Sequence, residues 1–352
     1  MNPYSIDRLT DWAARILGTA GVPPEDALVA ARLLVRSDLR GYRTHGLVRL
    51  PSYMDKLGSG ECRARPDVRL DTGPMLWTMD ADLALGQVAG QRLLEAAVPA
   101  MRSQPLLFVK LHNAGHLGAL GIFALAAAEA GLMCMLGQRT PPMLALPGFR
   151  RPAIGHNPFA FGCPAAGDRG PLVFDMACSV AARGHILMAA REGQEIPSGW
   201  ALDARGRPTT DAQAAADGML QPAGGYKGMG LAMMIECLAA ALPATPASNS
   251  RILMEMPRDG AMGGQSAFFF FLNPALAGDA DAFRAYMDNW MAHYRASGAP
   301  EQARIPGERG AHAERTGRAT GLAYGKATEE ALRRLGERHG IALTPSSAKE
   351  AR

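Results

Sequence analysis

Apolar positions at the start of the chain recur every three or four residues, which is the spacing of one face of a helix. Two prolines followed by Glu25 and Asp26 mark the start of a second helix that extends to about Leu34. The first seventy residues are therefore predicted to be helical. The apolar positions of the first predicted helix are Ile6, Leu9, Trp12, Ala13 and Ile16.

From about Val68 the pattern changes to short apolar runs that alternate with helical segments, which is typical of an α/β protein. The predicted strands are residues 75–79, 106–111, 132–136, 159–163, 172–174 and 267–272. The predicted helices are residues 87–101, 179–191, 228–242, 281–294 and 326–339. The last two helices are separated by a Pro/Gly-rich connection at residues 305–310.

The order helical, mixed, helical predicts that the two ends of the chain pack together beside a sheet. We expect a mainly helical domain at residues 1–70 and 278–345, and a mixed α/β domain at residues 71–277. Residues 346–352 are polar and are predicted to be a solvated tail.

Composition and charge narrow the class of protein. Of 352 residues, 48% are hydrophobic and 20% are charged, which excludes a disordered chain. The net charge of +4 is spread along the chain without a basic stripe, so nucleic acid is not an expected partner. The most hydrophobic stretch, residues 117–136, is interrupted by Glu129 and by glycines. It is predicted to be a buried helix and a core strand, and no membrane association is expected.

The number and spacing of the cysteines predict the cellular compartment of the protein. They are odd in number, widely spaced and never arranged as CxxC, so we expect buried thiols in a reducing cytoplasm. The N-terminus lacks the apolar core of a secretory signal. The five cysteines are Cys62, Cys134, Cys163, Cys178 and Cys237.

Residues 37–51, SDLRGYRTHGLVRLP, predict a helix end that breaks at Gly41 into a polar turn. The turn presents Thr44, His45 and Arg49. An imidazole can exchange a proton near neutrality, and a guanidinium can bind a carboxylate with two hydrogen bonds. The alternative is that the arginines form a solvated face and His45 only caps a helix.

Residues 112–121, HNAGHLGALG, follow a predicted strand and open a helix. His116 in this turn is a candidate acid/base or hydrogen-bond donor, and the alternative is a packed core histidine. His112 and His116 are four residues apart, but they are not preceded by a helix and form no HExxH motif. A metal site is therefore not expected.

Two further segments carry weaker signals. Residues 224–230, GGYKGMG, lead into an apolar helix and are a candidate phosphate cradle with Lys227, although glycine-rich helix starts are also common in structural roles. Asp175 ends a predicted strand and is a candidate for orienting a histidine, for binding a ribose or for capping its own turn. Ser179 is the predicted N-cap of the next helix. A GxSxG elbow is absent, so a serine hydrolase has little support.

Taken together, the motifs resemble the malate/L-lactate dehydrogenase-like oxidoreductases, which include sulfolactate, ureidoglycolate and diketogulonate dehydrogenases and cyclic ketimine reductases. The resemblance covers nearly the whole chain. The segments that carry it are DLRG (38–41), THGLVRLP (44–51), GHLG (115–118), GHNP (155–158), FDMA (174–177), ARG (182–184), IPSGW (196–200), TTD (209–211), GGYKG (224–228) and RIPGER (304–309).

The resemblance implies a mixed-sheet nicotinamide-binding domain of non-Rossmann type beside the helical domain, and a homodimer. It implies that NAD or NADP, without a metal, exchanges a hydride with C2 of a small 2-oxo or 2-hydroxy acid, or with its cyclic imine counterpart. A small carboxylate is thus the expected substrate. A ligand-binding or scaffold protein that kept the fold and lost the chemistry is the alternative from another class, and a hydrolase that needs no nicotinamide is a third.

The resemblance also assigns roles. His45 is the first choice for the acid that protonates the substrate carbonyl oxygen, supported by Thr44, and His116 is the competing choice. Arg49 is expected to hold the substrate carboxylate. The residues expected to bind the dinucleotide are Arg139, His156, Asn157, Phe174, Asp175, Met176, Ala177, Cys178, Tyr226, Lys227, Gly228, Pro306, Gly307 and Glu308.

Several positions depart from the family pattern. Thr44 replaces a serine, His185 replaces a lysine, and the segment 243–262 is unlike the typical member. Arg139 stands where the family usually has Asn, and His156 where it usually has Thr. These differences favour a substrate other than malate.

Overall fold

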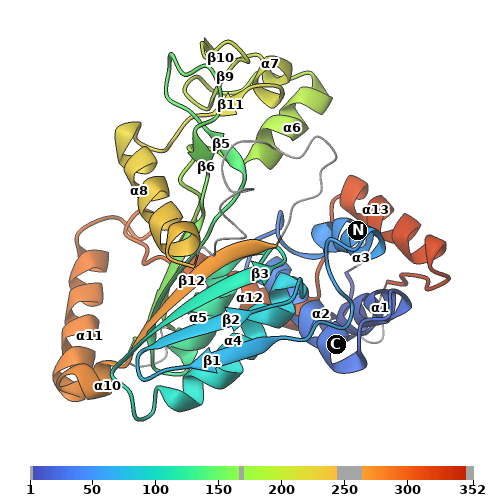
Figure 1. Cartoon of the computed structure of the whole chain (residues 1–352). Helices are drawn as coiled ribbons and strands as arrows, with labels where there is room; N and C mark the ends of the chain where they lie inside the picture. Colours follow the sequence, from blue (N-terminus) through green and yellow to red (C-terminus); the bar gives the residue numbers. More distant parts are fainter. Residues whose placement is uncertain (1–2, 166–169, 244–263, 346–352) are drawn as a thin grey trace.

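The computed structural model describes residues 3–165, 170–243 and 264–345 (Figure 1). Its main element is a seven-stranded mixed sheet in the order β1-β2-β3-β12-β4-β7-β8, in which β2 and β3 run parallel and the other neighbours antiparallel. The predicted α/β fold with a mixed sheet is confirmed. The strands are β1 (Arg69–Thr72), β2 (Leu76–Asp80), β3 (Leu106–Ala114), β12 (Gln265–Leu272), β4 (Met133–Gln138), β7 (Phe159–Cys163) and β8 (Leu172–Met176).

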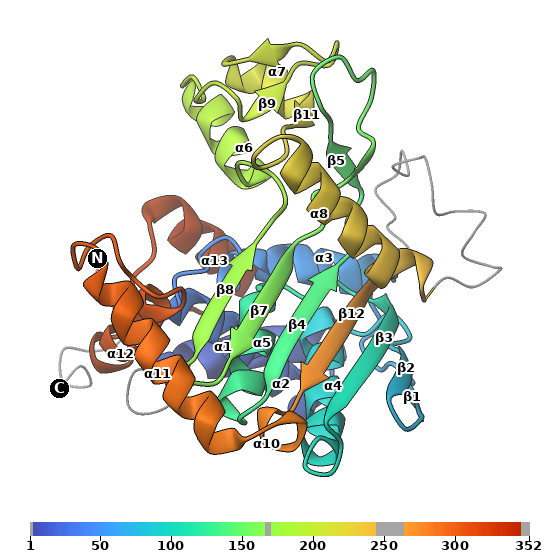
Figure 2. The ribbon, with the colours of Figure 1, turned by 90° about the vertical axis from the view of Figure 1, so that its left-hand side faces the viewer.

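The central strand β12 explains why the sheet is covered on both faces. Alternate side chains of a strand point to opposite faces, and β12 contains four consecutive phenylalanines. Phe269 and Phe271 are fully buried on the side of α4 (Gly86–Ala100) and α5 (Leu120–Glu129). Phe268 is fully buried on the other side. There α8 (Tyr226–Glu236) crosses the sheet (Figure 2) and continues into the π-helical turn η3 (Cys237–Ala241).

The two ends of the chain share a second hydrophobic core. Trp12 and Ile16 of the first helix pack there with Leu332 and Leu335 of the last helix. The backbone of Tyr4 also pairs with Leu322 in an isolated antiparallel bridge. The helices of this body are α1 (Ile6–Thr19), α2 (Pro24–Leu39), the 3-10 turn η1 (Leu47–Arg49), α3 (Leu50–Ser59) and α13 (Lys326–Arg338).

Only part of the segment after β12 belongs to this helical body. Following α10 (Pro274–Ala277), α11 (Ala280–Ala296) packs Met287 and Met291 against Cys163 and Leu172 of the outer strands. The exact limits of the two domains therefore stay a prediction, and the proposed tail, residues 346–352, lies outside the described residues.

A small lobe stands apart from the large sheet in Figure 2. It holds a five-stranded sheet in the order β10-β9-β11-β5-β6, which the sequence did not predict because strands of two or three residues are too short to show alternation. Its elements are β5 (Pro142–Leu144), β6 (Ile154–Gly155), α6 (Arg183–Glu192), β9 (Ala201–Leu202), β10 (Pro208–Thr209), α7 (Ala212–Ala216) and β11 (Met219–Leu220).

Three sequence predictions need correction. The connection at 305–310 contains the start of a helix, α12 (Glu308–Thr320), which lacks an apolar period because Gly310, Gly317 and Glu314 form its inner face. Ser179 is not a helix N-cap: α6 begins later, with Ala182 in that position. Cys237 is exposed, because it continues the outer face of α8 that carries Met233 and Met234, whereas the other four cysteines are buried as predicted.

The predicted buried helix and core strand at residues 117–136 are confirmed as α5 and β4. Within the described residues, every helix is too short or too polar to span a membrane. Of the divergent segment 243–262, all but Pro243 lies outside the described residues.

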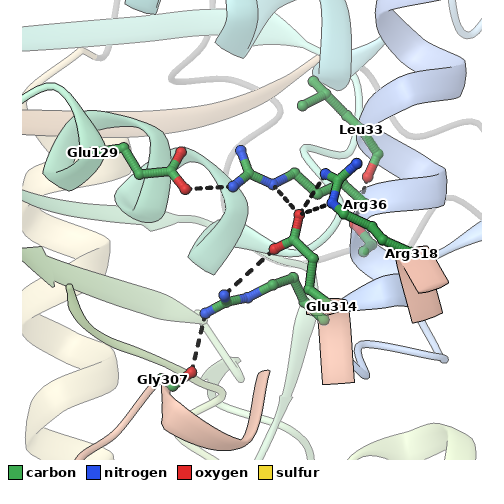
Figure 3. A network of polar contacts seen from close by, with 8 residues as sticks. Leu33, Arg36, Glu129, Gly307, Glu314 and Arg318 are labelled. Carbon is green, nitrogen blue, oxygen red and sulfur yellow. Dashed lines mark hydrogen bonds and ion pairs between the residues drawn. The ribbon is translucent and has the colours of Figure 1, made fainter. Parts of the chain in front are cut away.

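An ion-pair network centred on Glu314 joins α12 to α2 and α5 (Figure 3). Its carboxylate is buried and receives three guanidinium groups. Burial alone would raise the pKa of Glu314, but the surrounding arginines outweigh it and lower that pKa. The arginines and their N···O distances to Glu314 are Arg36 (3.3 Å), Arg40 (3.5 Å) and Arg318 (2.6 Å).

The same arginines bind groups beyond the helix. Arg36 also pairs with Glu129 at the end of α5, and Arg40 donates to the carbonyl oxygen of Gly307 at 3.2 Å. The network therefore sets the position of the turn that precedes α12.

We predict that Glu314→Gln lowers the free energy of unfolding by about 3 kcal/mol, because the buried guanidinium of Arg40 loses its counter-charge and the half-buried Arg36 loses one of two. Glu330→Gln, which breaks the exposed pair with Arg334, is the control and should cost about 0.5 kcal/mol or less. Urea denaturation measures both.

The pH dependence follows from the lowered pKa of Glu314. Its stabilising contribution is complete above the pKa of an unfolded-chain glutamate, about 4.3. It is lost as the pH falls through the lower pKa of the folded state, so parent and variant should converge in acid. Equal losses for both substitutions at pH 7 would contradict this account.

Candidate functional site

The turn between α2 and α3 is built on the buried carboxylate of Asp38. One oxygen of this carboxylate accepts hydrogen bonds from Leu47 N at 2.9 Å and from the Tyr324 hydroxyl at 2.8 Å. Gly46 lies so close that a Cβ there would stand 2.0 Å from Asp38 Oδ1. Burial raises the pKa of Asp38 to about 6. Asp38 thus ties the turn to both α2 and the C-terminal segment.

Within this turn the sequence-predicted residues meet. The Thr44 hydroxyl lies 2.8 Å from Nδ1 of His45, and Arg49 Nε donates to the carbonyl oxygen of Thr44 at 2.8 Å. Thr44 and Arg49 are exposed, whereas His45 is half-buried. This hydrogen bond to the Thr44 carbonyl holds Nε of Arg49 in place and leaves the two terminal guanidinium nitrogens available to a ligand.

His116 lies beside His45, with 5.6 Å between the ring centroids. The hydroxyl of Tyr53 is 2.9 Å from His116 Nδ1, and Gln87 Nε2 donates to that hydroxyl oxygen at 3.0 Å. The amide nitrogen of Gln87 also faces the carbonyl oxygens of His116 and Leu117, which settles its orientation. Because Gln87 donates to Tyr53, the hydroxyl proton of Tyr53 is directed to His116 Nδ1. The other nitrogen, Nε2, therefore carries the ring proton and is a donor.

A third imidazole, His156, occupies the turn after β6. Its Nδ1 lies 3.1 Å from the Thr140 hydroxyl, which accepts from Asn157 N at 3.2 Å. The buried side chain of Asn157 accepts from Thr140 N at 2.9 Å and donates to Glu236 on α8 at 2.8 Å. Glu236 also receives Arg139 Nε at 3.4 Å. The residues that depart from the family pattern, His156 and Arg139, thus belong to one polar group beside the histidines.

The electrostatics of the three histidines are linked. Burial and the charge of Arg49 lower the pKa of His45 to about 4. Burial, Arg183 and Arg49 lower that of His156 to about 4. Burial and the neighbouring cations lower the pKa of His116 well below its usual value. The site therefore holds three neutral imidazoles and a free guanidinium fork at neutral pH.

The predicted dinucleotide residues Phe174–Cys178 are the last three residues of β8 and the two residues that follow it. Asp175 accepts a hydrogen bond from Gly121 N at 2.7 Å and so caps α5, and burial raises its pKa to about 6. Cys178 N donates to the carbonyl oxygen of His156 at 2.8 Å. This segment consequently runs past the histidines, while the Asp175 carboxylate serves the helix. A role for Phe174, Asp175, Met176, Ala177 and Cys178 in cofactor binding stays a prediction.

The start of α8 has the form of an anion cradle. Gly224 and Gly225 have φ angles of +63° and +64°, and nothing would touch a Cβ on Gly225 within 4 Å. Tyr226 and Lys227 are exposed in the first turn of the helix, which begins two residues earlier than the sequence predicted. The N–H groups of Gly225, Lys227 and Gly228 are bonded within the turn, so the positive end of the helix dipole and the exposed Lys227 are the features that suit a phosphate. This part of the chain therefore fits a dinucleotide, with Gly228 packed beneath it against the Cys178 carbonyl.

The turn at Pro306–Glu308 lies at the other end of β8. Val173 N donates to the carbonyl oxygen of Pro306 at 2.9 Å, and a Cβ on Gly307 would stand 3.0 Å from the same nitrogen. The carboxylate of Glu308 binds Arg295 and Ile305 N. Two of the segments predicted to bind the cofactor, Phe174–Cys178 and Pro306–Glu308, thus lie at opposite ends of β8.

Sequence reasoning missed Tyr53, Gln87, Thr140 and Glu236. Tyr53 and Gln87 lie at core-facing positions of helices, so the sequence gives no sign that their polar atoms serve a histidine. Tyr53 lies four residues after Arg49, a spacing that makes two residues neighbours on one face of a helix, and this spacing was the signal that could have placed Tyr53 near the site. Among the described residues no cluster of His, Cys, Asp or Glu has the arrangement of a metal site.

Comparison with known proteins agrees with this geometry. Residues 4–333 match the family model described as malate/L-lactate dehydrogenase. The chain is 35% identical over 321 residues to (2R)-3-sulfolactate dehydrogenase (NADP(+)) of Chromohalobacter salexigens, covering 91% of this chain and 94% of that protein. It is 34% identical to Δ1-pyrroline-2-carboxylate reductase of Ancylobacter novellus, over 92% and 94% of the two chains.

A solved structure agrees as well. The crystal structure of Δ1-piperideine-2-carboxylate reductase from Pseudomonas syringae superimposes with a TM-score of 0.86 at 29% identity, over 95% of this chain and 100% of that one. The resemblance read from the motifs is therefore confirmed, and the chain belongs to the malate/L-lactate dehydrogenase family.

Proposed function

We propose that this protein is an NAD(P)-dependent oxidoreductase that transfers a hydride between the nicotinamide and C2 of a small 2-oxo or 2-hydroxy acid. The observation that carries the proposal is the convergence of Arg49 with His45 and His116 in one half-buried site. A guanidinium, a proton-exchanging imidazole and a neutral donor are the groups that reduction of a 2-oxo acid requires.

Arg49 holds the substrate. Its Nε is engaged by Thr44, so the guanidinium plane is set before substrate arrives. The two terminal nitrogens then bind the carboxylate in a fork, which places C2 next to the imidazoles. Binding by a preset group lowers the entropic cost of reaching the reactive geometry.

His45 exchanges the proton with the substrate oxygen. Its Nδ1 partner, the exposed Thr44 hydroxyl, can rotate and either donate or accept, so Nε2 of His45 can both take up and release a proton. With a pKa of about 4, His45 is deprotonated at neutral pH and available as the base for oxidation of a hydroxy acid, but its affinity for the proton is low until the charge of Arg49 is offset. A bound carboxylate offsets the charge of Arg49 and raises the pKa of His45 toward the range that a proton donor needs.

His116 contributes a hydrogen bond without exchanging a proton. Tyr53 and Gln87 keep its Nδ1 as an acceptor, so Nε2 presents a fixed N–H toward the site. Such a donor stabilises negative charge on the substrate oxygen as it develops.

The dinucleotide, when bound, supplies or accepts the hydride. Support for its position comes from the line of segments along β8, the anion cradle of α8 with Tyr226, Lys227 and Gly228, and the turn at Pro306–Glu308. In this proposal Arg139, His156 and Asn157 border the cofactor and the substrate together, and their departure from the family pattern favours a substrate other than malate.

The proposal includes a cytoplasmic homodimer. Free cysteines support the compartment. Exposed apolar side chains on α6 and α8 support a second copy. These side chains are Leu187, Met188, Met233 and Met234.

Reduction of a cyclic imine carboxylate is the second candidate reaction. The similarity to the pyrroline- and piperideine-2-carboxylate reductases favours it. Arg49 would bind the carboxylate in the same way, and C=N would replace C=O at the hydride position. A panel of 2-oxo acids and cyclic imines, assayed at 340 nm with NADH and with NADPH, separates the two reactions. Turnover with no member of the panel would leave the scaffold alternative.

We predict that kcat/KM for reduction declines as the pH rises across the neutral range, because only a minor fraction of His45 is protonated there. His45→Ala should remove this dependence and lower the rate by about a hundredfold to ten-thousandfold. His116→Ala should lower the rate and keep the dependence. The pH profiles of kcat/KM at saturating cofactor provide the test. Loss of the titration in His116→Ala, with survival in His45→Ala, would reverse the two roles.

We predict that Arg49→Lys lowers kcat/KM by about tenfold or more, because lysine keeps the charge and loses the planar fork. Arg338→Lys on α13 is the control and should have no effect. Arg49→Ala should not further slow the reduction of a methyl ketone that lacks the carboxylate. Parent rates in both Arg49 variants would show that the substrate is held elsewhere.

A further inference from the structure

A cavity of about 880 Å³ opens between the end of α11 and the start of α12. Arg295 near the end of α11 binds Glu308 in the first turn of α12, so these two helix ends meet at the β8 edge of the large sheet (Figure 2). One face of α12 lines the cavity with residues 308, 311, 312 and 315, while the opposite face packs on the helical body. The cavity's charged or titratable side chains are Arg295, Arg304, Glu308, Arg309, His312 and Arg315.

The residues that line this cavity do not balance its positive charge. Its one carboxylate, Glu308, is engaged by Arg295 and by Ile305 N. Arg304, Arg309 and Arg315 are exposed, and none of them forms an ion pair with a described residue. Three guanidinium groups around one cavity repel each other and attract an anion. Their planar forks suit the oxygens of a phosphate.

The cavity and the histidine site lie near opposite ends of β8. The Pro306 carbonyl is bonded to Val173 near the start of β8, and His156 is bonded to Cys178 just beyond the end of β8. Five residues of extended chain span about 16 Å. An extended dinucleotide with its nicotinamide at the histidines would therefore place its adenosine at the turn that borders the cavity.

We propose that this arginine-lined cavity binds the 2′-phosphate on the adenosine ribose of NADP, so that NADP is the preferred cofactor. The inference rests on the proposed oxidoreductase function for the placement of the dinucleotide. The charges themselves favour a phosphate monoester, because it carries up to two negative charges at neutral pH and NAD has only a hydroxyl at this position. The cavity volume suffices for a ribose and its phosphate.

Calorimetric titration with fragments tests the cavity without turnover. The probes are 2′,5′-ADP, 5′-AMP and inorganic phosphate. We expect 2′,5′-ADP to bind about tenfold or more tightly than 5′-AMP, which lacks only the 2′-phosphate. The advantage should shrink as salt is raised, because the contacts are exposed.

Variants assign the effect to the arginines. Arg304→Ala and Arg315→Ala should each reduce the 2′,5′-ADP advantage severalfold, and the double variant, which keeps only Arg309 of the three, should remove most of it. Arg304→Lys should retain part of it, because charge without the fork still attracts phosphate. Arg338→Ala, at an exposed arginine of α13 that is not part of the cavity lining, is the matched control and should keep the full advantage.

The outcomes separate this proposal from the proposed function. A 2′,5′-ADP advantage mostly lost in the double variant supports the cavity assignment, even if no 2-oxo acid or imine is turned over. Equal binding of 2′,5′-ADP and 5′-AMP by the parent overturns it, even if turnover with NADH and NADPH is found. Phosphate binding that depends on the arginines, without a 2′,5′-ADP advantage, also overturns it, since the cavity would then be a free-anion site. An advantage that persists in the double variant places the 2′-phosphate elsewhere.

Discussion

Three imidazoles lie mostly out of water and face Arg49, so each is kept neutral by the cost of burying a charge and by repulsion from a fixed cation. The rest of the site depends on this constraint. A neutral His45 takes up a proton only with difficulty while Arg49 is unscreened. In the proposed function, the fork of Arg49 binds an anion whose arrival reverses part of this repulsion. Under this proposal, substrate binding and proton exchange are coupled through one electrostatic interaction between Arg49 and His45.

The hydroxyl partners of His45 and His116 differ, and this difference sets how each imidazole can be protonated. Thr44, exposed and free to rotate, leaves His45 able to change its protonation, whereas Tyr53 is committed by Gln87 to donate to His116. The buried carboxylate of Asp38 and the network around Glu314 hold the surrounding turns. Buried charges cost stability unless they are fully partnered. Asp38 holds the turn that carries His45 and Arg49, and Glu314 acts through Arg40 on the turn at Gly307, so both carboxylates serve geometry.

Periodicity in the sequence was sufficient to predict the long elements. The phenylalanine-rich strand β12, the core strand β7 and the helices α1 and α11 are long and apolar enough for their period to be visible. Helix α12 was missed because glycines and a buried glutamate form its inner face, and the small sheet was missed because its strands are two or three residues long. In the site, His45 and Arg49 were predicted from one local turn. Tyr53 and Gln87 were not, because their contacts with His116 join segments distant in sequence. Of the roles that the sequence left open for Asp175, capping has a hydrogen bond in the structure, with α5 as the capped element and not the residue's own turn.

The central claim is that a substrate carboxylate switches His45 by offsetting Arg49. NMR titration of histidine-labelled protein, with His45 assigned by comparison with His45→Gln, measures this directly. The account predicts a pKa for His45 of about 4 in the free protein and a clear rise when oxamate, a carboxylate whose amide carbonyl resists hydride addition, binds together with the dinucleotide. A His45 that titrates near 6.5 in the free protein, or whose pKa does not change with oxamate, would contradict it.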